Sequence, residues 1–165
     1  MFRILRMLAC AAALACVATA PAAAQSLVRE KLPNDIGFEL LGKALAYSFY
    51  YQRTVTPYIG LEGGFGALGG GSDGDHTTVL FVPLGARLYA IPKNGTFFVS
   101  GGAVFLNAST DSGPFDDSVS NTFGYVGPGF EFRAESGFLF RGTAYALVHG
   151  DGFFIWPGLT LGYSF

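Results

Sequence analysis

The chain has 165 residues, of which 50% are hydrophobic and 16% aromatic, with 24 glycines and twelve acidic against ten basic side chains. Its mean hydropathy is positive, yet beyond the first 25 residues it contains no uninterrupted apolar run close to the ~18 residues that a membrane-spanning helix needs. The acidic balance and the lack of a Lys/Arg cluster exclude a typical nucleic-acid-binding protein.

The beginning of the chain has the three-part layout of a secretory signal peptide. A basic start precedes an apolar run, and small residues follow at 22–24. We therefore expect 1–24 to be a signal peptide, 25–35 a short N-terminal periplasmic segment and 36–165 the folded domain. Both cysteines lie within the expected signal peptide, so the exported chain is expected to use neither disulfides nor cysteine chemistry.

Clusters of turn-forming residues divide the rest of the chain into short segments. They lie at 54–57, 69–77, 91–95, 107–120, 134–137 and 149–152. Their spacing is typical of short strands joined in hairpins, and no helical periodicity competes with it.

Alternating side chains decide which face of each strand is apolar. In the segments 58–68, 79–90, 123–133 and 138–149, one face carries bulky apolar residues. The other face carries glycines, small residues and a mid-strand charge in each segment: Glu62, Arg87, Glu131 and Arg141. A soluble barrel would place its bulky face inside, whereas a small membrane barrel has a narrow interior and a lipid-facing exterior. The pattern therefore predicts a membrane barrel with these four charges inside.

The charges also predict a specific pairing. A tight turn centred on Ser136 places Glu131 directly opposite Arg141 across an antiparallel hairpin. Together with Glu62 and Arg87 they are expected to form a buried network of two acids and two bases, because an unpaired interior charge is costly. We interpret the network as structural rather than catalytic or conducting, and predict no catalytic residue, metal or cofactor.

The strand count depends on residues 36–53. The apolar face changes phase at Gly42-Lys43, so that a tight turn there gives eight strands and a bulge gives seven. We expect eight. Pro83, Pro128 and Pro157 fall within strands, where a missing N–H leads us to expect local bulges. The predicted fold class is all-β, a closed antiparallel up-and-down transmembrane β-barrel of eight strands.

The C-terminal segment PGLTLGYSF carries large apolar side chains at Leu159, Leu161, Tyr163 and Phe165. It resembles the C-terminal signal of outer-membrane β-barrel proteins, and together with FELLGKALAYSFYYQRTVTPYIGLEGGFG and VPLGARLYAI it resembles a family of small, mostly uncharacterised outer-membrane barrels. The resemblance implies a bacterial outer-membrane location, contact with lipid and lipopolysaccharide, and recognition by the barrel-assembly machinery. A monomer is expected, since a closed barrel has no free edge.

Counting back from the C-terminus places the long connections outside the cell and the short ones in the periplasm. Six aspartates fall in the outside connections: Asp73, Asp75, Asp111, Asp116, Asp117 and Asp151. They could bind divalent cations or simply be solvated, and His76 and His149 lie at the same rim. The favoured function is a structural or surface-interaction barrel. The alternatives are a lipid A-modifying enzyme, with Ser118 or Ser120 as nucleophile, a small-solute pore, and a soluble lipocalin-like binder.

Overall fold

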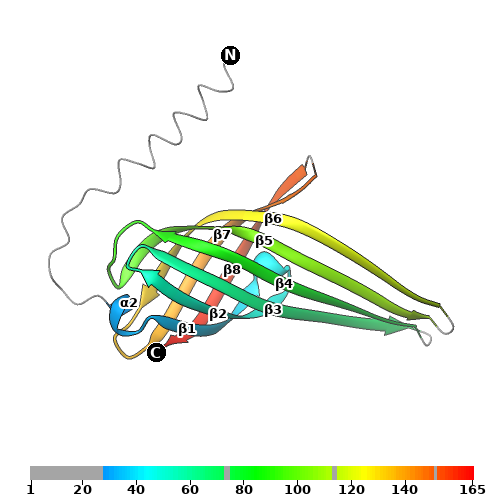
Figure 1. The fold of residues 1–165 in the computed structure, drawn as a ribbon, viewed down its shortest axis with the longest axis horizontal. Helices are drawn as coiled ribbons and strands as arrows, with labels where there is room; N and C mark the ends of the chain where they lie inside the picture. The colour runs from blue at the N-terminus through cyan, green and yellow to red at the C-terminus, as the bar shows by residue number, and fades with distance from the viewer. Residues whose placement is uncertain (1–27, 73–74, 113–114, 151) are drawn as a thin grey trace, which may run out of the picture.

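The structure, a computed structural model, describes residues 28–165 except for 73–74, 113–114 and 151. The expected signal peptide lies outside the described residues. The first element, the short helix α2 (Val28–Lys31), lies at one end of the barrel (Figure 1). No helix among the described residues is long and apolar enough to cross a membrane.

Eight antiparallel strands close into one barrel in chain order, with β8 paired to β1. They are β1 (Asn34–Leu41), β2 (Tyr47–Thr56), β3 (Ile59–Ser72), β4 (Asp75–Tyr89), β5 (Gly95–Ser112), β6 (Phe115–Arg133), β7 (Phe138–His149) and β8 (Gly152–Ser164). The prediction of eight strands is confirmed. The first strand begins two residues before the expected start of the folded domain at residue 36.

The phase change at Gly42-Lys43 is a tight turn, the 3₁₀ segment η2 (Gly42–Ala44). Leu41, Gly42 and Leu45 all have positive φ, of 58°, 69° and 69°, so the backbone reverses abruptly here. A Cβ atom at Gly42 would lie 2.4 Å from the Glu39 side chain. The turn is buried, because the chain folds inward and lies inside the barrel against β4, β7 and β8.

The strands β3 to β6 continue well beyond the ends of β1 and β2 (Figure 1). The predicted outside connections 69–77 and 107–120 were therefore too long, since both segments are mostly paired strand up to the gaps at 73–74 and 113–114. Polar residues that are typical of loops are paired across a hairpin instead, as at Asn107 and Ser120. The connection at 134–137 is confirmed, whereas the one expected at 149–152 is shorter, because β7 extends to His149 and β8 begins at Gly152.

The expected bulges at the three prolines are wrong. At Pro83 and at Pro128, two residue pairs are missing from the ladder with one of the two neighbouring strands. The ladder then resumes in the same register. Both prolines stay paired with their other neighbour, β5. Pro157 lies just beyond the last residue of β8 that pairs with β1. A missing N–H thus interrupts one ladder without an extra residue. Among the strand pairs that the structure describes, the register shifts between Thr54 and Thr56.

The last residue of the chain is part of the barrel wall. The Phe165 amide donates to the Asn34 carbonyl at 2.8 Å, and the Asn34 amide donates back to the Phe165 carbonyl at 3.0 Å. These bonds extend the β1–β8 seam to the final carboxylate, which explains why the apolar alternation continues to the end of the chain. The side chains of Leu159, Leu161, Tyr163 and Phe165 all point outward and are 43–55% exposed.

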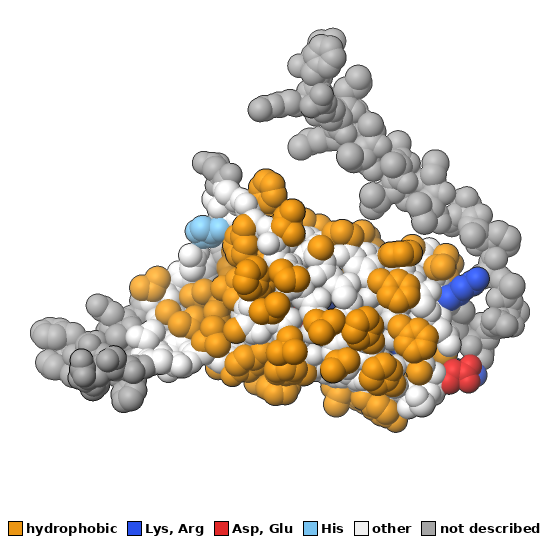
Figure 2. Space-filling view, turned by 180° about the vertical axis from the view of Figure 1, so that it is seen from behind, with side chains coloured by type: hydrophobic (Ala, Val, Ile, Leu, Met, Phe, Trp, Pro, Cys, Tyr) orange, Lys and Arg blue, Asp and Glu red, His pale blue; other side chains and the backbone are white. Residues whose placement is uncertain are grey.

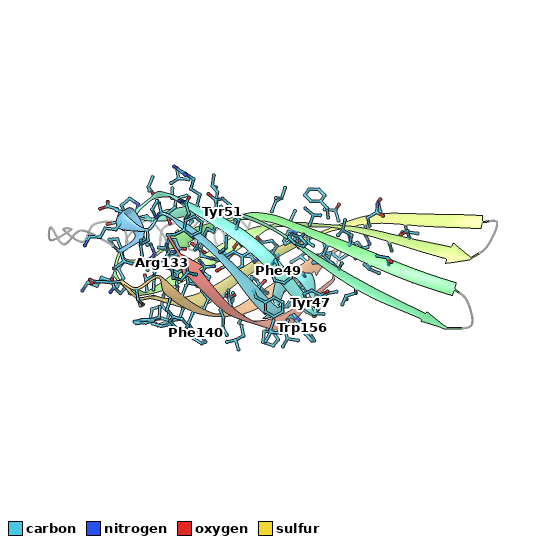
Figure 3. The ribbon with its side chains drawn as sticks, turned by 90° about the horizontal axis from the view of Figure 1, so that it is seen from below. Tyr47, Phe49, Tyr51, Arg133, Phe140 and Trp156 are labelled. Atoms are coloured by element: carbon cyan, nitrogen blue, oxygen red, sulfur yellow. The ribbon has the colours of Figure 1, made fainter. Side chains whose placement is uncertain are left out.

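The outer surface is apolar over most of its height (Figure 2). Figure 3 follows one aromatic row along β2, from Tyr51 through Phe49 to Tyr47. Among the side chains that the structure describes, the exposed charged ones are Glu30, Lys31, Arg53, Lys93 and Glu135. All five lie at the end that holds α2, Phe165 and the connections at 57–58, 90–94 and 134–137, which we call the short-turn end. The opposite end, where the long hairpins project, is the hairpin end.

Glycines on the inner face make room for interior aromatic rings. Cβ atoms added at Gly85 and at Gly102 would lie 2.1 Å from the Tyr125 hydroxyl and 2.1 Å from the Leu84 carbonyl, respectively. Similarly, Gly158 lies against the Tyr145 ring. The glycine-rich inner faces found in the sequence therefore leave space for the interior tyrosine side chains.

Candidate functional site: the charged interior of the barrel

The four charged residues expected inside the barrel lie there in two ion pairs. Glu131 is opposite Arg141 in the register, with the Arg141 Nε 2.5 Å from the Glu131 Oε2. On the neighbouring strands, the Arg87 Nη2 lies 2.7 Å from the Glu62 Oε2. All four side chains are buried.

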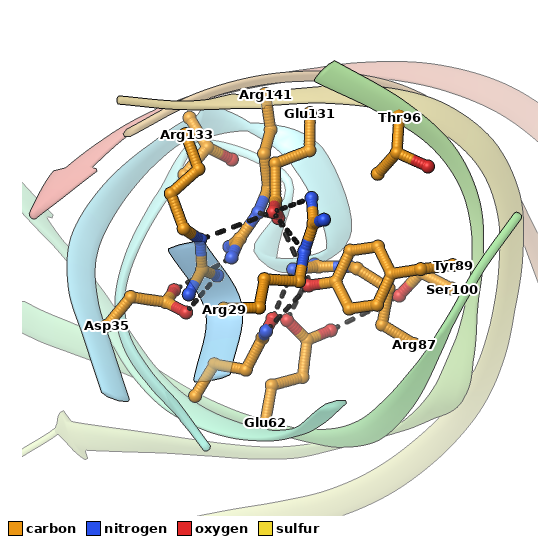
Figure 4. Close-up of polar contacts among 12 residues, drawn as sticks. Arg29, Asp35, Glu62, Arg87, Tyr89, Thr96, Ser100, Glu131, Arg133 and Arg141 are labelled. Atoms are coloured by element: carbon orange, nitrogen blue, oxygen red, sulfur yellow. Dashed lines mark hydrogen bonds and ion pairs between the residues drawn. The ribbon is translucent and has the colours of Figure 1, made fainter. Parts of the chain in front are cut away.

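Five further charged residues are buried with them, making four carboxylates and five cations in all: Asp35, Glu39, Glu62, Glu131, Arg29, Lys43, Arg87, Arg133 and Arg141. The expected network of two acids and two bases was therefore too small. Figure 4 shows most of them converging on the barrel axis from opposite walls.

The cluster nearest the short-turn end is built around Asp35 and Glu131. The two Asp35 oxygens each accept a 2.7 Å bond, one from Arg133 and one from Arg141. The Glu131 Oε1 accepts from Arg29 of α2 at 2.7 Å. The short helix thus closes this end with a guanidinium that reaches into the barrel, and the Arg29 plane also stacks over the Tyr89 ring at 4.3 Å.

Glu62 is the centre of a second cluster. Besides Arg87, it lies 3.3 Å from the Lys43 Nζ and accepts hydrogen bonds from the Ser100 and Tyr125 hydroxyls at 3.2 and 3.0 Å. Both carboxylate oxygens therefore have charged partners and hydrogen-bond donors, as a buried ion requires.

Neutral side chains join the clusters into one continuous network. The Gln52 carbonyl accepts from Arg87, and its amide donates to the Tyr89 hydroxyl at 2.7 Å. That hydroxyl donates to Glu131 at 3.1 Å. Towards the hairpin end, Lys43 of the inward turn lies 3.2 Å from Glu39. Hydrogen bonds and ion pairs therefore connect α2 at one end with η2 at the other.

Sequence reasoning missed five members of the network, although four of them carried a signal. Asp35 and Glu39 alternate on one face of β1, opposite its bulky residues, and Arg133 is two residues from Glu131 on the same face. Lys43 marks the phase change itself. Arg29 was assigned to a periplasmic segment, and no sequence pattern indicates that it would turn into the barrel.

Each of the nine buried charged side chains contacts a partner of opposite charge. Within the described residues, no group of three or more His, Cys, Asp or Glu side chains is placed to hold a metal ion. His149 is exposed at the hairpin end, as is Ser120. The side chains of His76, Ser118 and the six hairpin aspartates lie outside the described part of the chain.

Comparisons with known proteins support the fold. No family model and no curated protein sequence matches the chain. Among solved structures, the N-terminal β-barrel domain of OprF from Pseudomonas aeruginosa aligns with a TM-score of 0.58 and 15% identity, over 80% of this chain and 96% of that one. The attachment invasion locus protein Ail of Yersinia pestis, in complex with the heparin analogue sucrose octasulfate, aligns with a TM-score of 0.55 and 17% identity, over 79% and 94%. The chain therefore has the closed eight-stranded fold of small outer-membrane β-barrels.

Proposed function

We propose that the protein is an outer-membrane β-barrel with a structural or surface-interaction role, whose interior is closed to solutes. The placement in the membrane rests on the apolar outer surface of the barrel. β8 is 13 residues long, and at about 3.3 Å per residue and a tilt of about 40° it rises roughly 30 Å, enough for the hydrocarbon layer. The short connections at 57–58, 90–94 and 134–137 support placing the short-turn end in the periplasm.

The hairpin end then faces the cell exterior. Six of the twelve acidic residues of the chain lie in 69–77, 107–120 and 149–152, and none of its ten basic residues does. The projecting hairpins would therefore present acidic tips to the medium. The similarity to Ail, whose name denotes attachment, is a similarity of fold, so the surface-interaction role rests on these hairpins.

The single observation that supports a closed interior is the burial of the charged network. Four arginine side chains inside the barrel are each at most 1% exposed to solvent: Arg29, Arg87, Arg133 and Arg141. Eight strands leave an interior just wide enough for side chains, and here arginines and tyrosines occupy it. A non-enzymatic role fits this interior, because its charges are all engaged with one another.

The C-terminal side chains extend the proposal to biogenesis. Leu159, Leu161, Tyr163 and Phe165 form one outward row along β8, which an assembly machine could recognise as an exposed strand face. This row would act during insertion and then contact lipid.

Single-protein conductance in a planar lipid bilayer tests the closed interior. We expect the wild-type protein to give no stable conductance steps. A variant with both Glu131→Gly and Arg141→Gly removes one facing pair without changing the net charge, and is expected to conduct. Stable, discrete conductance of the wild-type protein would contradict the proposal and favour a small-solute pore.

A further inference from the structure

The polarity of the barrel interior inverts near the hairpin end. Between the short-turn end and η2 the inner face is charged. Between Ala44 and the hairpin end it is apolar, with Phe81, Val104 and Leu147 buried. On β4, β5 and β6 the outer face becomes polar, with exposed Thr78, Asn107 and Thr122, whereas the outer face of β8 stays apolar. The buried apolar side chains pack against one another, but Leu45, Leu106 and Phe123 at the edge of this core are only partly buried. Such apolar surface is unfavourable in water and favours an apolar ligand.

The apolar lining contains an unfilled groove of about 430 Å³. Its floor is formed by Leu45 of the inward turn, and its walls by Leu106, Phe123, Leu147 and Phe154 from β5 to β8. Asn121 and His149 are its polar lining residues. The volume falls within the range of small-molecule sites, and such sites combine an apolar lining with a few polar groups.

The groove opens sideways towards the outer surface. The β6–β7 ladder ends at Gly124 and Val148, and beyond this point β6 continues with β5 while the β7–β8 hairpin diverges from it (Figure 1). The groove lining includes Val148 and Phe153, whose side chains belong to the outward face of β7 and β8. The groove is therefore continuous with the apolar outer surface, at the level where that surface becomes polar.

We infer that this groove binds one apolar chain of an amphiphile from the outer leaflet, such as a fatty acyl chain. The tail enters through the gap between β6 and β7 and lies against Leu106, Phe123 and Leu147. The polar head stays at the membrane surface near Asn121 and His149. The inference rests on the proposed membrane placement, which puts the groove at the boundary between headgroups and acyl chains.

Trp156 is a built-in reporter for this site. It is the one tryptophan of the chain, its indole N–H donates to the Leu45 carbonyl at 3.0 Å, and its ring packs edge-on against Phe154. Both neighbours line the groove (Trp156 is labelled in Figure 3). A brominated chain in the groove would therefore quench its fluorescence.

The experiment titrates the protein, folded into phosphatidylcholine vesicles, with 12-bromododecanoic acid. We expect saturable quenching of Trp156, weakened roughly tenfold by Leu106→Asn, which places an amide in the apolar lining, and also weakened by Leu106→Phe, which fills the groove. The matched control is Leu80→Asn, an isosteric change on the outer face of the adjacent strand. It is expected to leave the affinity unchanged.

Quenching that rises without saturation and equally in all variants would show partition into the bilayer only, and would overturn the inference. Dimers that form with increasing protein concentration and are blocked by Leu106→Asn would also overturn the inference. In that case a second copy of the chain would occupy the groove. Gel mobility of unboiled samples reports insertion for each variant. Inserted wild-type protein without saturable quenching contradicts the groove alone, whereas failure to insert contradicts the membrane placement and the groove together.

Discussion

At the scale of single residues, the interior of the barrel depends on charge balance. Transfer of an ion out of water costs several kcal/mol, and the cost is offset only where partners and hydrogen bonds surround the ion. Glu131 illustrates the requirement, since it contacts Arg29, Arg141 and the Tyr89 hydroxyl. Removal of this carboxylate deprives several guanidinium groups of one of their acceptors.

Glu131→Gln is therefore expected to lower the free energy of unfolding by about 3–5 kcal/mol. Glu135→Gln is the matched control, because Glu135 is exposed in the connection four residues later, and it is expected to change the stability by less than about 0.5 kcal/mol. Denaturant unfolding of the two variants in lipid vesicles measures the difference. Equal midpoints for both would mean that the interior network contributes little.

The inner glycines give a second prediction at this scale. Gly85→Ala forces a methyl group to within 2.1 Å of the Tyr125 hydroxyl and 2.6 Å of the Gly101 carbonyl, so Tyr125 must move and loses its bond to Glu62. We expect a destabilisation of about 1–3 kcal/mol. Gly142→Ala is the control, since nothing lies within 4 Å of its added Cβ. The same unfolding assay checks both, and a Gly85→Ala variant as stable as Gly142→Ala would disprove the tight packing.

At the scale of elements, the seam between β1 and β8 decides whether the barrel closes. The two backbone bonds between Asn34 and Phe165 form its last rung. Deletion of Phe165 removes both, each contributing about 1 kcal/mol, whereas Phe165→Leu keeps them. We expect the deletion to lower the stability of the refolded protein in vitro, and the substitution to leave that stability nearly unchanged while lowering the yield of assembled protein in cells.

The two effects can be separated by measuring refolded stability and cellular yield for both variants. If Phe165→Leu assembled in cells as well as the wild type, the aromatic ring would have no role in assembly. If the deletion were as stable in vitro as the substitution, the terminal rung would not contribute to closure.

The sequence predicts most of the strands, because the alternation of apolar with small or charged residues along each strand is visible in the sequence itself. The phase change at Gly42-Lys43 located the first turn, and Ser136 fixed the register that pairs Glu131 with Arg141. Two kinds of feature could not be predicted. The inward fold of η2 depends on attraction between Lys43 and two carboxylates from other strands, and the extent of the hairpins depends on backbone pairing between segments whose Gly, Ser, Thr and Asn content is also typical of loops.

At the scale of the whole molecule, two opposite polarity patterns are stacked along one barrel. The larger part is apolar outside and charged inside, while towards the hairpin end β4, β5 and β6 become apolar inside and polar outside. The first pattern suits a lipid environment and the second an aqueous one. The change from one to the other marks the proposed outer surface of the membrane, and the inferred acyl-chain groove lies at that change.

Heat-dependent migration of the protein from the outer-membrane fraction on a denaturing gel tests the central claim most directly. A closed barrel in lipid is expected to fractionate with the outer membrane, and its unboiled form to migrate as a compact, detergent-resistant species that shifts after boiling. Recovery of the protein in the soluble periplasmic fraction, with the same migration before and after boiling, would contradict the membrane barrel.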